Sequence, residues 1–159
     1  MTDIENTSFT EEYENNLKLI KNNFKLISIY SCPCKRKKMT DEDWKNYKNE
    51  HLSNIWKCLH DLSFSFLINP NENSQQLMFN LLTIELTKIP CSTCRVHYKT
   101  YLKNFNHLED ICKNKFLLIT WMIDLHNDVN KRLNKKELTY EEVFEYYKFN
   151  YNSCKTDWA

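Results

Sequence analysis

Residues 74–105, SQQLMFNLLTIELTKIPCSTCRVHYKTYLKNF, decide the fold of this chain. The residues expected to face inward recur at helical spacing and are Leu77, Leu81, Leu82, Ile84 and Leu86. Pro90 ends this helix, and a further helical segment runs from Cys91 to about Phe105. Cys91 and Cys94 form a C-x-x-C pair that stands between two helices, at the start of the second. A thioredoxin-like site needs a preceding strand and a βαβ surround, so this setting disfavours a thioredoxin-like fold.

The rest of the chain also follows the helical period. Helices are expected over residues 8–29, 40–67 and 115–133, from Ser74 to Pro90, from Cys91 to Phe105, and after the capping pair Thr139 and Glu142. No segment alternates with period two, so no sheet is expected. The sequence predicts an all-α protein: a four-helix bundle with a short fifth helix, preceded by an N-terminal helical extension.

The expected organisation has three parts. Residues 1–48 are the N-terminal extension, residues 49–150 the helical bundle and residues 151–159 a tail. The apolar stripe of the first helix, from Tyr13 to Ile27, could serve dimerisation or cap the core. Residues 30–39 break the helical pattern and are interpreted as a mobile connector.

Composition excludes several classes of protein. The 159 residues include no glycine, so neither the G-x-G-x-x-G dinucleotide loop nor the G-x-x-x-x-G-K phosphate loop can be present. The net charge of +1 gives no argument for a nucleic-acid partner. No stretch resembles a signal-peptide core and no apolar run approaches ~18 residues, so we expect no membrane span and synthesis in the cytosol.

The cysteines indicate redox chemistry. Seven cysteines without a secretion signal suggest metal binding or redox activity before structural disulfides. The N-terminus of a helix carries partial positive charge, which lowers the pKa of a nearby thiol such as that of Cys91 or Cys94. The thiolate so favoured is the form that disulfide exchange requires.

The Cys91–Cys94 pair has two other interpretations. A zinc site would need a second pair of similar spacing, and the candidate, Cys32-Pro33-Cys34, has one intervening residue instead of two. His97 or His107 could assist such a site, but we assign no metal ligands. The pair could also be two ordinary buried cysteines, which Pro90 directly before it disfavours.

Three segments carry a family resemblance. They are Trp56–His60 (WKCLH), Pro90–Cys94 (PCSTC) and Trp121–Asn130 (WMIDLHNDVN), in this order in a helical chain. They resemble the W-x-x-L-H, C-x-x-C and W-x-x-x-x-H-N-x-V-N segments of the Erv/ALR family of FAD-linked sulfhydryl oxidases. The short form is most similar to members encoded by large DNA viruses.

The resemblance implies FAD in the mouth of a four-helix bundle, which agrees with the missing glycine loops. The residues assigned to the cofactor are Trp56, His60, Cys94, Trp121, His126, Asn127, Asn130, Lys131, Lys135 and Tyr147. The spacing itself places Trp56 and His60 on one helix face, where a flat ring could stack. Lys131 and Lys135 could neutralise the diphosphate, and Phe66 is a weaker candidate for the pocket. Each of these residues taken alone has an ordinary packing or surface explanation.

The resemblance also implies the activity: an FAD-dependent thiol oxidase that forms disulfides in protein substrates and passes electrons to oxygen, releasing hydrogen peroxide. Cys94 would lie beside the flavin, and Cys91 would be attacked by the incoming thiol. Implied partners are a thiol-containing protein, for instance a thioredoxin-like carrier, and a second copy of the chain. The expected location is the host cytoplasm, and the virion if the chain is viral. The alternative is a zinc-binding or flavin-free helical adaptor.

The remaining cysteines have separate interpretations. We hypothesise that Cys32 and Cys34 form a shuttle that relays disulfides to a substrate; the alternative is two unpaired exposed thiols. Cys58 is expected to be a small buried residue. The structural disulfide of cellular family members is expected to be missing, and Cys112 and Cys154 could form a different link or remain free. Leu52-Ser53 replaces a Gly-Arg pair of the family, so one phosphate contact is in doubt.

Overall fold

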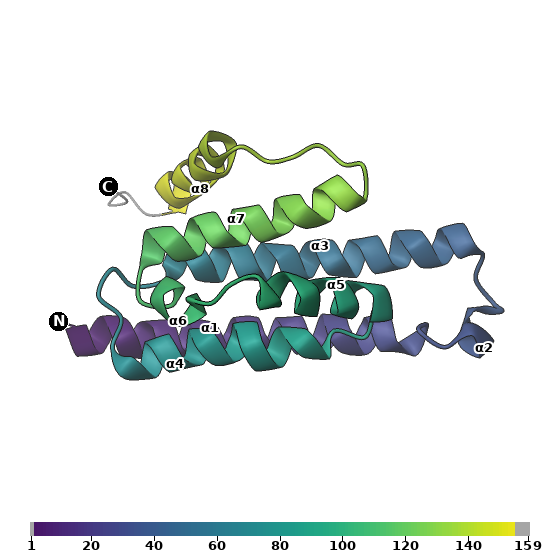
Figure 1. Cartoon of the computed structure of the whole chain (residues 1–159), viewed down its shortest axis with the longest axis horizontal. Helices are drawn as coiled ribbons and strands as arrows, with labels where there is room; N and C mark the ends of the chain where they lie inside the picture. Colours follow the sequence, from purple (N-terminus) through teal and green to yellow (C-terminus); the bar gives the residue numbers. More distant parts are fainter. Residues whose placement is uncertain (1, 155–159) are drawn as a thin grey trace.

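The computed structural model describes residues 2–154 and is all-α, as predicted, with no strand in that range. Figure 1 shows long helices lying side by side in one elongated body. The elements are α1 (Thr2–Ile29), α2 (Pro33–Arg36), α3 (Asp41–Ser65), α4 (Glu72–Asn80), the π-helix η1 (Leu81–Glu85), the 3-10 helix η2 (Leu86–Lys88), α5 (Ser92–Lys103), α6 (Leu108–Ile111), α7 (Lys115–Arg132) and α8 (Tyr140–Cys154).

Side-chain caps fix where the helices begin. Thr40 and Asp43 form the predicted capping box of α3. The prediction that Ser74 opens the next helix is wrong by two residues, because Asn71 is the cap and its side chain accepts a hydrogen bond from the Ser74 backbone N–H at 2.8 Å. α1 also begins earlier than predicted, at Thr2, so the expected start at residue 8 lies inside the helix.

The segment before Pro90 is not one regular helix. α4 passes into the π-helix η1 and then into the 3-10 helix η2. Leu82 and Leu86 face the core as predicted, but Ile84 is 47% exposed, which corrects its expected inward orientation. The π-turn changes the number of residues per turn, so the predicted 3.6-residue stripe loses its register there.

The N-terminal helix α1 belongs to the core. Its stripe packs along α3 and also contacts α4, and Ile20 and Ile27 are fully buried. Full burial of such a side chain contributes about 1.5–3 kcal/mol. Of the two roles considered for this stripe, the structure shows that it caps the core. The expected extension therefore shares one hydrophobic cluster with the bundle, and the domain boundary at residue 48 stays a prediction.

Two buried asparagines set the position of α1. The Asn6 side-chain oxygen accepts hydrogen bonds from the Asn71 backbone N–H at 3.0 Å and the Ser74 hydroxyl at 2.7 Å. At the other end of α1, the Asn23 oxygen lies 2.9 Å from His51 Nδ1. Because a buried polar group without a partner is costly, these contacts allow one register of α1 against α3 and α4.

A smaller core joins α8 to the bundle. Phe64 of α3, Ile119 and Ile123 of α7, and Val143 and Tyr147 of α8 pack together. Figure 1 shows α8 lying across α7 after a long connection. The predicted caps Thr139 and Glu142 exchange hydrogen bonds at the start of α8, which confirms that helix signal.

The connector between α1 and α3 contains an ordered turn. Residues 33–36 form α2, and the Arg36 guanidinium lies 5.4 Å from the Trp44 ring centroid. The connector is therefore not irregular throughout, and its mobility stays a prediction. None of the helices in the described range is long and apolar enough to cross a membrane.

Candidate active site

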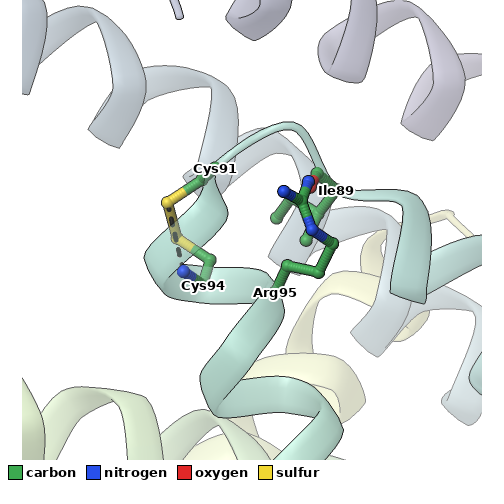
Figure 2. Close-up of a disulfide and its surroundings, with 4 residues drawn as sticks. All are labelled: Ile89, Cys91, Cys94 and Arg95. Carbon is green, nitrogen blue, oxygen red and sulfur yellow. Dashed lines mark hydrogen bonds between the residues drawn. A yellow bond between two sulfur atoms is a disulfide. The ribbon is translucent and has the colours of Figure 1, made fainter.

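Cys91 and Cys94 form a disulfide at the start of α5, with their Cα atoms 5.2 Å apart. Cys91 is the N-cap of the helix, and its Sγ accepts a hydrogen bond from the Cys94 backbone N–H at 3.3 Å (Figure 2). When the pair is reduced, the helix N-terminus favours the thiolate form. The arrangement can therefore exchange disulfides with another thiol.

Arg95 holds the loop that carries the pair. Its Nη1 donates a hydrogen bond of 2.8 Å to the carbonyl oxygen of Ile89, on the other side of the cysteines (Figure 2). Cys91 is 8% exposed and Cys94 is more exposed. The assignment of Cys91 as the outer cysteine and Cys94 as the flavin-side cysteine stays a prediction.

Trp56, His60 and His126, predicted from two separate segments, lie together between α3 and α7. The Trp56 and His126 rings are stacked, with centroids 4.0 Å apart and planes 3° apart. His60 Nε2 lies 2.9 Å from His126 Nδ1. The four-residue spacing of Trp56 and His60 puts both on the face of α3 that meets α7.

The two histidines are neutral at neutral pH. Burial lowers the pKa of His60 to about 4. Burial, together with the nearby His60 and Lys135, lowers the pKa of His126 to about 3. Within the described range, His60 Nδ1 is buried and has no hydrogen-bond partner. This nitrogen is available to a group that binds beside the pair.

A pocket of about 480 Å³ opens beside this cluster. Its lining residues are Ser53, Trp56, Lys57, His60, His126, Leu138, Glu142, Val143, Tyr146 and Tyr147. A mostly aromatic and apolar lining with a few polar groups is typical of cofactor sites. Trp56, His60, His126 and Tyr147 were predicted. The wall from α8 and the preceding loop was otherwise missed, although the Tyr146-Tyr147 pair was a signal for it.

Tyr147 is held in the pocket wall by two contacts. Its hydroxyl donates a hydrogen bond of 2.8 Å to Asp61 Oδ1, and its ring stacks on Phe64 with centroids 4.0 Å apart. Asp61 also accepts a hydrogen bond of 2.9 Å from Lys57 Nζ. Asp61 was not predicted, because a lone acidic residue on a helix gives no sequence signal for this contact.

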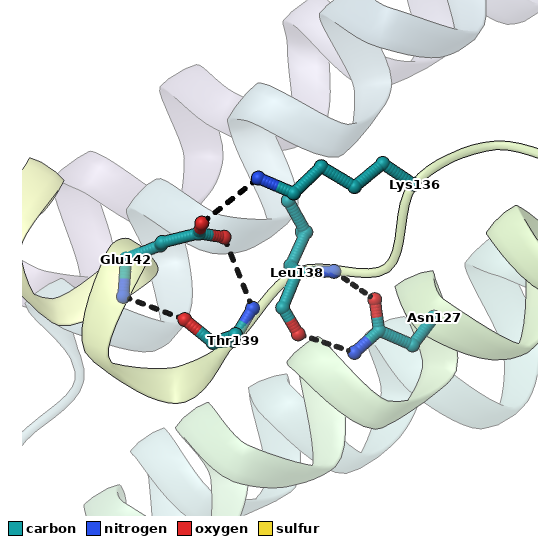
Figure 3. A network of polar contacts seen from close by, with 5 residues as sticks. All are labelled: Asn127, Lys136, Leu138, Thr139 and Glu142. Carbon is teal, nitrogen blue, oxygen red and sulfur yellow. Dashed lines mark hydrogen bonds and ion pairs between the residues drawn. The ribbon is translucent and has the colours of Figure 1, made fainter.

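Asn127 lies on α7 and fixes the loop before α8. Its side-chain nitrogen donates to the Leu138 carbonyl at 2.8 Å, and its oxygen accepts from the Leu138 N–H at 2.7 Å (Figure 3). Figure 3 also shows the neighbouring Lys136–Glu142 ion pair, at 2.9 Å. These contacts bring Leu138 to the pocket wall. Asn127 therefore has a partner within the chain, and its predicted contact with the cofactor stays a prediction.

Residues 53–150 match the family model described as Erv1 / Alr family. The chain belongs to the Erv1/Alr family. The matched range includes all three motifs and every wall of the pocket.

Several relatives of the chain are named FAD-linked sulfhydryl oxidases. A protein of Acanthamoeba polyphaga mimivirus, named probable FAD-linked sulfhydryl oxidase, is 29% identical over 107 residues, which are 67% of this chain and 70% of that protein. An FAD-linked sulfhydryl oxidase of African swine fever virus is 32% identical over 58% of this chain and 76% of its own length. The mitochondrial FAD-linked sulfhydryl oxidase of Saccharomyces cerevisiae is 30% identical over 50% of this chain and 41% of its own length. No solved structure matches the chain.

Other predicted residues of the Erv1/Alr site lie apart from the pocket lining. Trp121 is 3% exposed, packs edge-on against Tyr101 and Phe105, and has a buried Nε1 without a partner among the described residues. Phe66 is buried edge-on against Phe9. Both are members of the main core.

The predicted polar residues at the end of α7 differ in their surroundings. Asn130 is 7% exposed, and its carbonyl accepts a hydrogen bond of 2.8 Å from the Lys135 N–H. Lys131 is exposed and pairs with Glu137 at 3.5 Å. Their contacts with a cofactor stay predictions.

The other cysteines within the described residues are free. Cys32 and Cys34 are exposed, whereas Cys58 and Cys112 are buried. Burial raises the pKa of the Cys58 thiol and that of Cys112, the latter to about 12, so both keep their protons at neutral pH. The Cys154 side chain lies outside the described residues, and so does its predicted link to Cys112.

The pocket residues fit a flat aromatic cofactor. The pocket walls carry the rings of Trp56, His126 and Tyr147, and His60, whose buried Nδ1 has no partner among the described residues, also lines the pocket. Aromatic rings of this kind suit stacking against a flat cofactor. No phosphate-binding glycine loop is needed for such a site, in agreement with a sequence that has none.

Proposed function

We propose that this chain is an FAD-dependent thiol oxidase that forms disulfide bonds in protein substrates. The observation that carries the proposal is the Cys91–Cys94 disulfide at a helix N-terminus, in a chain of the Erv1/Alr family. Relatives of the chain named FAD-linked sulfhydryl oxidases support the cofactor and the reaction.

Trp56, His60, His126 and Tyr147 would hold the cofactor through ring contacts and one hydrogen bond to His60 Nδ1. Lys135 follows α7 and would bring positive charge toward a diphosphate. When bound, FAD accepts the two electrons of a dithiol and delivers them to molecular oxygen, with release of hydrogen peroxide.

The protein's own sulfurs carry out the exchange with substrate. A substrate thiolate attacks Cys91 Sγ, the Cys91–Cys94 bond breaks, and Cys94 leaves as a thiolate at the N-terminus of α5. The second substrate thiolate then attacks the substrate sulfur of the mixed disulfide and releases the Cys91 thiolate. The substrate gains a disulfide, and the reduced pair holds the two electrons.

Turnover with a small dithiol tests this proposal. The purified protein should consume oxygen and release peroxide when a dithiol is added, and Cys91→Ser or Cys94→Ser should lower the rate by about 10³-fold or more, because the exchange needs both sulfurs. Cys58→Ala removes a buried thiol outside the pair and should leave the rate within about twofold, as a matched control. Turnover that survives Cys94→Ser would contradict the proposed site.

Cys32 and Cys34 are proposed as a shuttle that relays the disulfide from Cys91–Cys94 to protein substrates. Both thiols are exposed, as a relay requires. A hydrogen bond from the Cys34 thiol lowers the pKa of Cys32, with Lys35 contributing, whereas the pKa of Cys34 is raised. Cys32 is therefore the better nucleophile of the two.

The proposal extends to partners and location. By its resemblance to family members, we place the chain among the virus-encoded oxidases and expect a homodimer, a thioredoxin-like carrier as one substrate, and residence in the host cytoplasm and the virion. Sedimentation showing one species at the mass of a single chain would reject the dimer. Absence of the chain from purified virus particles in quantitative mass spectrometry would reject the proposed location in the virion.

A further inference from the structure

A π-turn lies directly before the redox disulfide. Leu81–Glu85 forms the π-helix η1, and Leu81 and Leu82 are fully buried in the core. Only η2, Ile89 and Pro90 separate this turn from Cys91. Single π-turns within helices are frequent at functional sites, where they re-aim the residues that follow.

Tyr98 connects the disulfide helix to this π-turn. Its hydroxyl donates a hydrogen bond of 2.5 Å to the Leu82 carbonyl, and this contact is buried. Tyr98 follows Cys94 by four residues, so the two side chains lie on one face of α5. Burial raises the pKa of Tyr98, so the hydroxyl keeps its proton and remains a donor.

The segment that carries the disulfide stays against the core on both sides of the pair. Leu86 of η2 is 5% exposed and Cys91 is 8% exposed. The Arg95 side chain donates a hydrogen bond to the Ile89 carbonyl just before the pair. The Tyr98 bond to Leu82 adds a buried side-chain hydrogen bond that links α5 to η1.

We propose that Tyr98 is a positioning residue for the Cys91–Cys94 pair: its hydrogen bond to the Leu82 carbonyl fixes α5 against the core and so sets the rate at which the reduced pair passes on its electrons. This inference rests on the proposed function, since it takes Cys91–Cys94 as the pair that reduces the flavin. Electron transfer between a thiolate and a bound ring requires close, fixed geometry, and a shift of about 1 Å can cost roughly 10²-fold in rate.

Tyr98→Phe removes the hydroxyl and keeps the ring, so it tests the bond directly. In the full chain as purified, amide hydrogen exchange over residues 91–98 should become at least about fivefold faster, the loss expected for one buried hydrogen bond. Mixed anaerobically with a dithiol, the variant should reduce its flavin about tenfold more slowly. The KM for the dithiol should remain unchanged, because substrate binding does not use this bond.

Two further variants make the test specific. Tyr101→Phe removes a hydroxyl from the same helix that makes none of the hydrogen bonds found among the described residues, and it should leave both rates at the wild-type value. Replacing Tyr98 with 4-aminophenylalanine retains a donor and should restore both. If Tyr98→Phe does not fold, 4-fluorophenylalanine at this position fills the space of the hydroxyl without donating and takes its place.

Wild-type exchange and reduction rates in the variant without a donor would overturn the inference, and so would equal effects of the Tyr98 and Tyr101 variants. Cys94→Ser separates this failure from failure of the proposed function. If Cys94→Ser blocks flavin reduction while loss of the Tyr98 donor has no effect, only the positioning role falls. If Cys94→Ser also reduces its flavin at the wild-type rate, the proposed redox pair falls as well.

Discussion

His60 and His126 share a hydrogen bond in a setting that removes the charge from both. Burial is the main cause, and it lowers the pKa of His60 to about 4 and that of His126 to about 3. The unfolded chain takes up protons on both residues near pH 6.5, whereas the folded chain does not. Stability therefore falls as the pH falls below about 6.5, and it continues to fall until the folded-state pKa values are reached.

The free energy of unfolding should consequently drop with acid more in the wild type than in a variant without this pair. Between pH 7 and pH 4.5 we expect the free energy of unfolding of the wild type to fall by at least about 2 kcal/mol more than that of the double variant His60→Gln plus His126→Gln. Each histidine can contribute roughly 1.4 kcal/mol per pH unit, and the expected value is set lower because the site is partly exposed. Denaturant unfolding at the two pH values measures the difference.

His107 supplies the control for this prediction. Its side chain is 83% exposed, so His107→Gln should keep the wild-type dependence on pH. Equal pH dependence in the wild type and in the double variant would show that the buried histidines do not titrate as the structure indicates.

Single residues were predictable where a family motif contained them. Trp56, His60 and His126 were assigned from such motifs, and the four-residue spacing of Trp56 and His60 agreed with a shared helix face. The sequence could not show whether Asn127 binds a cofactor or the chain itself. Its partner is the backbone of Leu138, and backbone groups are the same for nearly every residue type. The stacking of Trp56 on His126 likewise depends on how α3 and α7 pack.

Whole elements were predictable where capping signals and apolar periods agreed. The capping boxes of α3 and α8 are examples. The π-turn at Leu81–Glu85 was not predictable, because its leucines fit an α-helical stripe equally well and tertiary packing decides between the two forms. The short helix α2 was missed because a four-residue segment is too short to show a helical period.

The proposed shuttle pair lies at the short helix α2, where Cys32 is the N-cap and Cys34 is within the helix. Cys32→Ser plus Cys34→Ser should slow oxidation of a reduced protein substrate by about tenfold or more, since direct access of a protein to Cys91–Cys94 is sterically poorer than access through an exposed thiol pair. Parallel rates for dithiothreitol and for an unfolded, reduced protein measure this effect. Arg36→Ala should show the same selective loss to a smaller extent.

Unchanged oxidation of the protein substrate in the double cysteine variant would reject the shuttle. Equal losses with dithiothreitol and with protein would also reject it, because they would indicate damage to the central site. Lys37→Ala, on the exposed side of the same connector, is the matched surface control for Arg36→Ala.

At the scale of the whole molecule, the all-α class followed from the sequence, but the place of α1 did not. Its stripe from Tyr13 to Ile27 identified a buried face, and periodicity does not tell which partner covers such a face. The structure shows that α3 and α4 do, with Asn6 and Asn23 fixing the register. The main core thus includes residues of α1, α3, α4 and α7, and the smaller core around α8 lies beside the pocket.

The central claim is that a flavin bound to this chain exchanges electrons with the Cys91–Cys94 disulfide. Its most direct test is the absorption spectrum of the purified protein before and after addition of a dithiol without oxygen. We predict a flavin band near ~450 nm that the dithiol bleaches in the wild type, that air restores, and that persists in Cys94→Ser. A folded protein without this band, or a band that the dithiol bleaches equally fast in Cys94→Ser, would contradict the account.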